Sequence, residues 1–356
     1  MTQRNMTSGD DIRARKDAHL EITARGEGAF RSATTLFEEV QLVHQALPEL
    51  ALDAIDLGTE WMGRPLKAPL LIGAMTGGTE TARETNLGLA AVAEELGVGF
   101  CLGSQRVMAE HPEAAASFQV REVAPTIPIL GNIGLVQAME WGPAGVAALA
   151  EAVGADGMAI HLNPAQELAQ RHGDRDFRGG AAFLAELVQA LDVPIMVKET
   201  GAGLSRQVGE ALVAAGVGWA EIAGAGGTSW VRVEVERGAA PAWIGPLLSE
   251  WGVPTAASLL QLEGLPLQRV ASGGVRDAMD VAKALALGAQ ACALAQPVLV
   301  AWREGGAEGA RAFLSELIDG LRAICLLTGA PSAAALASAP RIIGPRLAAW
   351  TPEARR

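Results

Sequence analysis

The chain has 356 residues, half of them hydrophobic, and a formal net charge of −12. This length can form one large α/β barrel or two domains. The negative charge argues against a general nucleic-acid-binding surface, so local basic residues, a metal ion or backbone N–H groups would have to bind an anionic ligand. The chain has three cysteines and no CxxC pair, which predicts a reducing compartment and no disulfide framework.

The N-terminal part is polar and has no repeat, and we expect residues 1–67 to form an extension ahead of the main domain. Residues 1–22 lack the apolar core of a signal peptide. The most apolar stretches, such as residues 291–302, are too short to span a bilayer. We therefore predict a cytoplasmic protein without membrane contact. The basic cluster of Arg15, Lys16 and His19 is either a solvated helix start or a segment that folds over the binding site and holds a diphosphate.

A rhythm of eight short apolar runs begins at Pro69, with stretches able to form helices between most of them. The runs cover residues 68–78, 97–106, 127–134, 155–163, 193–201, 217–230, 267–274 and 289–297. Strands alternating with helices predict parallel pairing and right-handed crossovers, and continuous apolar runs suit strands buried on both faces. Eight units favour a (β/α)₈ TIM barrel over residues 68–330, followed by a C-terminal tail over 331–356. The alternative, a doubly wound open sheet, usually has fewer strands and a GxGxxG turn, which no run carries.

Polar residues collect where these runs end, and the carboxyl ends of barrel strands are where such enzymes place their chemistry. The candidates are Thr76, Ser104, Gln105, Arg106, Asn132, His161, Asn163, Lys198, Glu199, Thr228, Ser229 and Arg276.

Two glycine-rich loops follow successive runs, in "AGAGGTSW" (223–230) and "SGGVR" (272–276). Glycines allow backbone N–H groups to approach a ligand, and a following helix N-terminus favours an anion. Together the loops predict a grip on one phosphate, typical of flavin-mononucleotide barrels. The simpler alternative is a pair of ordinary turns between strand and helix.

Lys198 lies inside an apolar run, where a lysine is costly unless it is paired or belongs to a site. It could face a flavin, form a Schiff base or pair with Glu199. The stretch "GAMTGG" (73–78) could likewise be core filling or a small-residue surface for a flat aromatic ligand.

The stretch "HLNPAQE" (161–167) crowds four polar side chains at the end of a buried run. One histidine without a nearby cysteine is a poor zinc set, whereas amide and carboxylate oxygens suit Mg²⁺. Glu167 is therefore the predicted metal ligand, and Asn163 and Gln166 are predicted substrate contacts. The alternative is a polar loop that caps the following helix.

These motifs together resemble the type 2 isopentenyl-diphosphate isomerases. The resemblance rests on "RKDAH", "GAMTGG", "GSQR", "GNIG", "HLNPAQE", "VKETGAG", "AGAGGTSW" and "SGGVR", and it runs from about residue 15 to about residue 300. It implies a barrel that binds FMN and Mg²⁺, works with reduced flavin, takes NADPH as reductant, and assembles as a homotetramer or homo-octamer.

The resemblance also implies roles for particular residues. Catalytic roles fall to His161, Gln166 and Glu167, with Glu167 binding Mg²⁺. Substrate contacts are expected from Arg15, Lys16, His19, Ser104, Gln105, Arg106, Asn163 and Gln166. FMN contacts are expected from Ala74, Met75, Thr76, Ser104, Asn132, Lys198, Thr228, Gly274, Val275, Arg276, Ala295 and Gln296. Ala223 and Ala225 depart from the family, many of whose members carry serine in this loop, so one hydroxyl contact to the FMN phosphate is expected to be missing.

The implied reaction moves the double bond of isopentenyl diphosphate, by adding one proton and removing another, to give dimethylallyl diphosphate. The main alternative is an FMN-dependent 2-hydroxy-acid oxidoreductase. Those enzymes generally use tyrosines to bind the substrate carboxylate, and this chain has no tyrosine. A Schiff-base aldolase using Lys198 and a non-enzymatic flavin-binding protein are the remaining alternatives.

Overall fold

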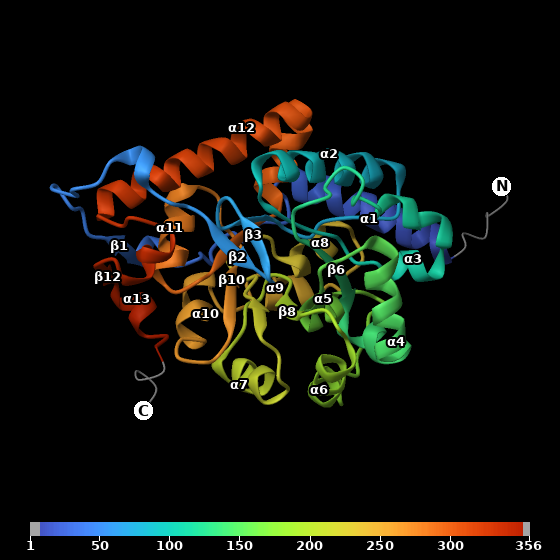
Figure 1. The fold of residues 1–356 in the computed structure, drawn as a ribbon. Coiled ribbons are helices and arrows are strands. Elements are labelled where there is room, and N and C mark those ends of the chain that lie inside the picture. The colour runs from blue at the N-terminus through green and yellow to red at the C-terminus, as the bar shows by residue number, and fades with distance from the viewer. Residues whose placement is uncertain (1–7, 352–356) are drawn as a thin grey trace.

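The structure is a computed structural model that describes residues 8–351, and among these the side chains of residues 15–108 and 111–351. The outermost parts of the predicted extension and tail, residues 1–7 and 352–356, lie outside the described residues. Figure 1 shows a barrel surrounded by helices, with the long helix α12 lying across one side.

Eight parallel strands close the barrel in the order β10-β11-β4-β5-β6-β7-β8-β9. Their bounds are β4 Leu70–Ile72, β5 Gly99–Cys101, β6 Ile129–Gly134, β7 Gly157–Leu162, β8 Ile195–Glu199, β9 Trp219–Glu221, β10 Gln268–Ala271 and β11 Ala291–Leu294. Each of the eight predicted runs contributes one strand. The predicted (β/α)₈ barrel is therefore confirmed, and the open doubly wound sheet is wrong.

The helices follow the strands as the sequence pattern predicts. The α-helices are α1 Ser8–Ala24, α2 Glu80–Leu96, α3 Arg106–Glu110, α4 Leu135–Val153, α5 Pro164–Ala169, α6 Gly180–Ala190, α7 Arg206–Ala214, α8 Trp230–Glu236, α9 Ile244–Leu248, α10 Thr255–Gln261, α11 Ala278–Ala286, α12 Gln296–Thr328 and α13 Pro345–Ala348. Short 3₁₀ helices cover Phe37–Glu39, Leu52–Ala54, Pro112–Ser117 and Ala334–Ser338.

Capping residues mark where several of these helices begin and end. The side chains of Thr79, Ser205 and Asp277 accept hydrogen bonds from backbone N–H groups in the first turns of α2, α7 and α11. Gly97 and Gly154 end α2 and α4 in the left-handed conformation, which glycine adopts without steric cost.

A two-stranded hairpin closes the amino end of the barrel. It pairs β2 Thr59–Trp61 with β3 Arg64–Leu66. Trp61 is 1% exposed and packs with the inward-facing side chains of the barrel strands. A functional site is therefore expected at the opposite end, where the strands finish.

One segment of the N-terminal extension and one segment of the C-terminal tail pair with each other outside the barrel. Strand β1 Val40–Leu42 pairs antiparallel with β12 Arg341–Ile343, and Figure 1 shows this pair beside α13, on the side of the molecule opposite α4. No sequence pattern predicts that the extension and the tail pair with each other, and the division of the chain at residues 67 and 330 stays a prediction. Helix α1 packs against α3, α8 and α12, which brings its basic residues to the barrel mouth. No helix in the described part of the chain is long and apolar enough to cross a membrane.

Candidate active site

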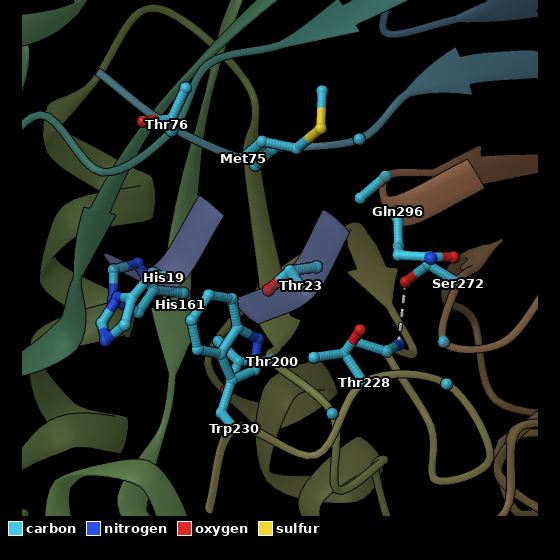
Figure 2. A pocket seen from close by; sticks show the side chains of 18 of the residues that line it. His19, Thr23, Met75, Thr76, His161, Thr200, Thr228, Trp230, Ser272 and Gln296 are labelled. Atoms are coloured by element: carbon cyan, nitrogen blue, oxygen red, sulfur yellow. Dashed lines mark hydrogen bonds between the residues drawn. The ribbon is translucent and has the colours of Figure 1, made fainter. Parts of the chain in front are cut away.

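A cavity of about 430 Å³ opens at the carboxyl ends of the barrel strands. All eight strands contribute to its wall through their last residues or the loops that follow, and α1 contributes from above. The cavity is lined by all but one of the 21 residues for which the family resemblance implies a catalytic, substrate-binding or FMN-binding role, the exception being Gln105. The 20 lining residues are Arg15, Lys16, His19, Ala74, Met75, Thr76, Ser104, Arg106, Asn132, His161, Asn163, Gln166, Glu167, Lys198, Thr228, Gly274, Val275, Arg276, Ala295 and Gln296. In the view of Figure 2, His19 and His161 lie toward one end of the cavity, and Thr228, Ser272 and Gln296 lie toward the other.

Gln105 is one of three predicted residues that lie outside the cavity lining; the others are Glu199 and Ser229, from the list of strand ends, and Ser229 caps the start of α8. The side chain of Gln105 is fully buried behind the wall, where it accepts a hydrogen bond from the backbone N–H of Asn132 at 2.8 Å and donates one to the carbonyl of Leu149 at 3.0 Å. Both ends of the amide are thus engaged by the backbone. The expected contact between Gln105 and the substrate is corrected to a structural role in holding the strand that carries Asn132.

Helix α1 closes over the cavity through three polar contacts. Arg15 donates to the side chain of Gln170 at 3.1 Å, Lys16 donates to the carbonyl of Ser104 at 3.0 Å, and His19 lies 3.0 Å from Glu234. Of the two alternatives for this basic segment, the structure therefore supports the one that folds over the barrel mouth.

Glu234, on α8, was missed from sequence and connects several site residues. Its side chain is fully buried and accepts hydrogen bonds from His19, from Arg237 and from Gln170. Burial alone would raise its pKa, but the hydrogen bonds from His19 and Arg237 outweigh burial and lower the pKa to about 2. The stretch "SWVRVEVER" offered no motif, although a glutamate within an apolar helical run was a usable signal.

The "HLNPAQE" stretch forms the end of β7 and the short helix α5. One carboxylate oxygen of Glu167 accepts from the side chain of Asn163 at 2.8 Å, and the other accepts from the backbone N–H of Asp174 at 2.8 Å. These bonds fix the orientation of a 9% exposed carboxylate while leaving each oxygen a further lone pair. The alternative, a purely helix-capping role, does not fit, because Asn163 makes no side-chain bond to the backbone at the start of α5.

His161 is held as a neutral imidazole. Its Nδ1 lies 2.9 Å from Oδ1 of Asn132, whose amide nitrogen is committed to the carbonyl of Leu102, so Nδ1 carries the proton and donates it. Burial, with the charges of Lys198 and Lys16, lowers the pKa of His161 to about 3. A neutral ring presents its other nitrogen as an acceptor, so the positive charge at this end of the cavity comes from the lysines and arginines.

The two glycine-rich loops lie against each other at the other end of the cavity. A Cβ atom added to Gly227 would lie 2.3 Å from the backbone nitrogen of Gly274, so only glycine permits this approach. Arg276 spans both loops, donating to the carbonyls of Gly274 at 3.0 Å and Gly226 at 3.1 Å. The loops therefore form one concave backbone surface at the N-terminal end of α11.

The floor of the cavity carries a row of polar side chains on neighbouring strands. In the barrel register His161 lies opposite Lys198, and Lys198 lies opposite Glu221. The Lys198 ammonium donates to the carbonyl of Glu199 at 2.7 Å and lies 3.7 Å from Glu221. One role left open for Lys198 was a salt bridge with Glu199. The structure pairs Lys198 with Glu221 instead, because the Glu199 side chain accepts hydrogen bonds from the backbone of residues 200–202.

The residues present fit FMN. Among the described residues, Thr23 Oγ1, Thr76 Oγ1 and Glu221 Oε2 are buried polar atoms of the cavity wall without a hydrogen-bond partner, as expected where a polar ligand completes the site. The backbone surface of the two loops suits a terminal phosphate. Mg²⁺ fits less completely: within the described part of the chain no group of three His, Cys, Asp or Glu could hold a metal ion. A site with Glu167 as the protein carboxylate, completed by substrate phosphate and water, remains consistent with how Mg²⁺ binds.

Comparisons with known proteins agree with this arrangement. Residues 11–123 and 263–342 match the family model for FMN-dependent dehydrogenases. An isopentenyl-diphosphate delta-isomerase from Synechococcus is 44% identical over 328 residues, covering 90% of this chain and 94% of the relative. The proteins of that name from Deinococcus radiodurans, 44% identical over 90% of this chain and 96% of the relative, and from Methanosarcina barkeri, 40% identical over 95% and 93%, give the same result.

The chain belongs to the isopentenyl-diphosphate delta-isomerase family. Solved structures show a more distant likeness of fold alone. A mandelate oxidase variant with an FMN adduct superposes with a TM-score of 0.63 at 18% identity, covering 94% of this chain and all of the other. A lactate oxidase from Pediococcus acidilactici superposes with a TM-score of 0.67 at 14% identity, covering 96% of each chain.

Proposed function

We propose that this protein is an enzyme that converts isopentenyl diphosphate to dimethylallyl diphosphate with bound FMN and Mg²⁺. The observation that carries the proposal is that the chain belongs to this family and also has a cavity whose two ends suit FMN and a diphosphate. Relatives named for this reaction match over nine-tenths of the chain, and one cavity combines the surface of the two glycine-rich loops at one end with Glu167 and the basic residues of helix α1 at the other.

The chain's own residues divide the task of binding the substrate. Arg15, Lys16 and Arg106 would neutralise the diphosphate, which is a charge-assisted contact and stronger than a neutral one. Glu167 would bind Mg²⁺ on the diphosphate oxygens. Holding the charged end in place would position the apolar end of the substrate over the middle of the cavity, where positioning lowers the barrier.

When bound and reduced, FMN would supply an acidic N–H group and an electron-rich ring beside the alkene. Lys198, Thr76 and Met75 would hold the ring, and the loops at Gly227 and Gly274 would hold the phosphate. Gln166 would contact the carbon skeleton, and its side chain lies 3.4 Å from Glu234. Neutral His161 would offer a hydrogen-bond acceptor without adding charge.

An anaerobic isomerase assay tests the proposal. Purified protein is first denatured to identify the released flavin, which should be FMN rather than FAD. The protein with Mg²⁺ is then given isopentenyl diphosphate before and after the flavin is reduced with dithionite or NADPH. Substrate and product have the same oxidation state, so we expect turnover only after reduction, with many products per flavin and no stoichiometric NADPH oxidation.

The same purified protein also distinguishes the isomerase from the alternative, an oxidoreductase. An FMN-dependent 2-hydroxy-acid oxidoreductase would lose its oxidised flavin absorbance on addition of a 2-hydroxy acid and would show no isomerase activity. One NADPH consumed per product would also overturn the isomerase proposal. The homotetramer or homo-octamer implied by the family resemblance stays a prediction that light scattering can test, and the cytoplasmic location stays a prediction as well.

A further inference from the structure

Glu221 is a buried carboxylate that the proposed reaction does not use. It ends strand β9, and its side chain is 4% exposed. Isolated charges are rarely buried, because the free energy of removing a charged group from water is not offset unless the group has a counter-charge and hydrogen bonds. Lys198, directly opposite on β8, supplies the counter-charge at 3.7 Å.

The two oxygens of this carboxylate have different surroundings. Oε1 accepts a hydrogen bond from the hydroxyl of Ser272 at 2.8 Å and faces Lys198. Ser272 is itself fixed, because its oxygen accepts from the backbone N–H of Ala223 at 3.0 Å. Oε2 is buried and finds no hydrogen-bond donor on any residue that the structure describes. A buried acceptor without a hydrogen-bond donor costs folding free energy, and the cost is larger when the group is charged.

The position of Glu221 indicates which part of a ligand it meets. It precedes the first phosphate loop on β9, as Ser272 precedes the second on β10, so both lie deeper in the cavity than Gly227 and Gly274. Figure 2 shows Ser272 and Thr228 on the same side of the cavity. A flavin anchored by its phosphate on these loops must pass Glu221 before its ring reaches Lys198. The part of FMN between phosphate and ring is the ribityl chain, which carries hydroxyl groups able to donate hydrogen bonds.

We propose that Glu221 is a flavin-positioning residue whose Oε2 accepts a hydrogen bond from a ribityl hydroxyl of FMN. The inference rests on FMN occupying this cavity, as in the proposed function. Ser272 and Lys198 orient the carboxylate from one side, and the cofactor satisfies it from the other. Glu221 thereby links the phosphate end of the cofactor to the lysine beside its ring.

The test measures flavin affinity rather than activity. Deflavinated protein is titrated with FMN and with FMN analogues that each lack one ribityl hydroxyl, following the quenching of flavin fluorescence. For the wild-type protein we expect one analogue to bind roughly 10- to 100-fold more weakly than FMN, as for loss of a hydrogen bond to a charged group. The Glu221→Gln variant should bind FMN more weakly by a similar factor and should no longer distinguish that analogue from FMN.

The matched control is Glu167→Gln, another buried carboxylate of the same cavity, which should keep the wild-type order of affinities. Equal weakening of FMN and all analogues by Glu221→Gln would limit Glu221 to pairing with Lys198 and overturn the inference. So would a wild-type protein indifferent to every ribityl hydroxyl, a measurement that needs no variant to fold. A wild-type protein that binds no FMN would overturn the proposed function too, whereas one that binds FMN and isomerises without hydroxyl dependence overturns this inference alone.

Discussion

Glu167 is the residue on which the metal proposal depends. Replacing it with Gln keeps the shape of the side chain and can keep the bond from Asn163, but it removes the charge that Mg²⁺ needs. We expect isomerase turnover at limiting Mg²⁺ to fall roughly 100-fold or more, while FMN content stays at the wild-type level. Steady-state assays across a Mg²⁺ titration measure this. Glu186→Gln, an exposed glutamate on α6, is the control and should behave as wild type. Normal turnover of Glu167→Gln at limiting Mg²⁺ would exclude Glu167 as the ligand.

His161 gives a prediction about pH. Its pKa is about 3 in the folded protein, against 6.5 for an ordinary histidine. The unfolded chain therefore binds more protons between these values, and the contribution of His161 to stability is fully present above pH 6.5 and is lost as the pH falls toward 3. Nitrogen-15 NMR of histidine-labelled protein should show a neutral ring with the proton on Nδ1 from pH 5 to pH 8, with the resonance assigned by its loss in His161→Gln. An imidazolium signal appearing between pH 5 and pH 7 would contradict this.

At the same scale, the sequence predicts which residues reach the cavity better than it predicts their partners. Thr76, Asn132 and Lys198 could be placed because barrel strands end at one face. Gln105 could not be excluded, because its neighbours Ser104 and Arg106 do line the cavity and only the backbone geometry turns it toward Leu149. Glu221 could not be predicted as a site residue, because it lies within an apolar run and belongs to none of the motifs at the strand ends.

Helix α1 is the element that completes the substrate end of the cavity. Arg15 and Arg25 are a matched pair, since Arg15 lines the cavity while Arg25, just beyond the helix, is exposed and bonds to Glu21. Arg15→Gln should raise KM for the diphosphate substrate roughly tenfold or more, because a charge-assisted phosphate contact is lost. Arg25→Gln should leave KM nearly unchanged, as exposed ion pairs contribute little. Equal KM values for the two variants in a steady-state assay would show that α1 does not bind the diphosphate.

The elements of the barrel were predictable because each follows from a local pattern. Apolar runs ending in glycine or polar residues located all eight strands, and helices such as α2 and α4 fell in the intervening stretches. The pairing of β1 with β12 was not predictable, because it joins residues some 300 positions apart through strands of only three residues, too short to carry a periodic pattern. Long-range pairing of this kind depends on the finished fold rather than on the segment.

For the whole molecule, the pairing of β1 in the N-terminal extension with β12 in the C-terminal tail raises the question of whether these segments unfold together with the barrel. Leu347 on α13 is fully buried in the main hydrophobic core, whereas Ile342 on β12 is 59% exposed. Replacing each of these two large aliphatic residues with alanine therefore tests whether burial of the tail stabilises the protein. Leu347→Ala should cost about 2–5 kcal/mol of unfolding free energy, and Ile342→Ala should change it by no more than about 0.5 kcal/mol. If the tail and the barrel form one cooperative unit, thermal unfolding of Leu347→Ala will remain a single transition at a lower temperature. An unchanged main transition, with a protease cutting the tail at temperatures below it, would show instead that the tail opens separately. The N-terminal extension that pairs with the tail at β1 would then be held to the barrel by α1 and its neighbours alone.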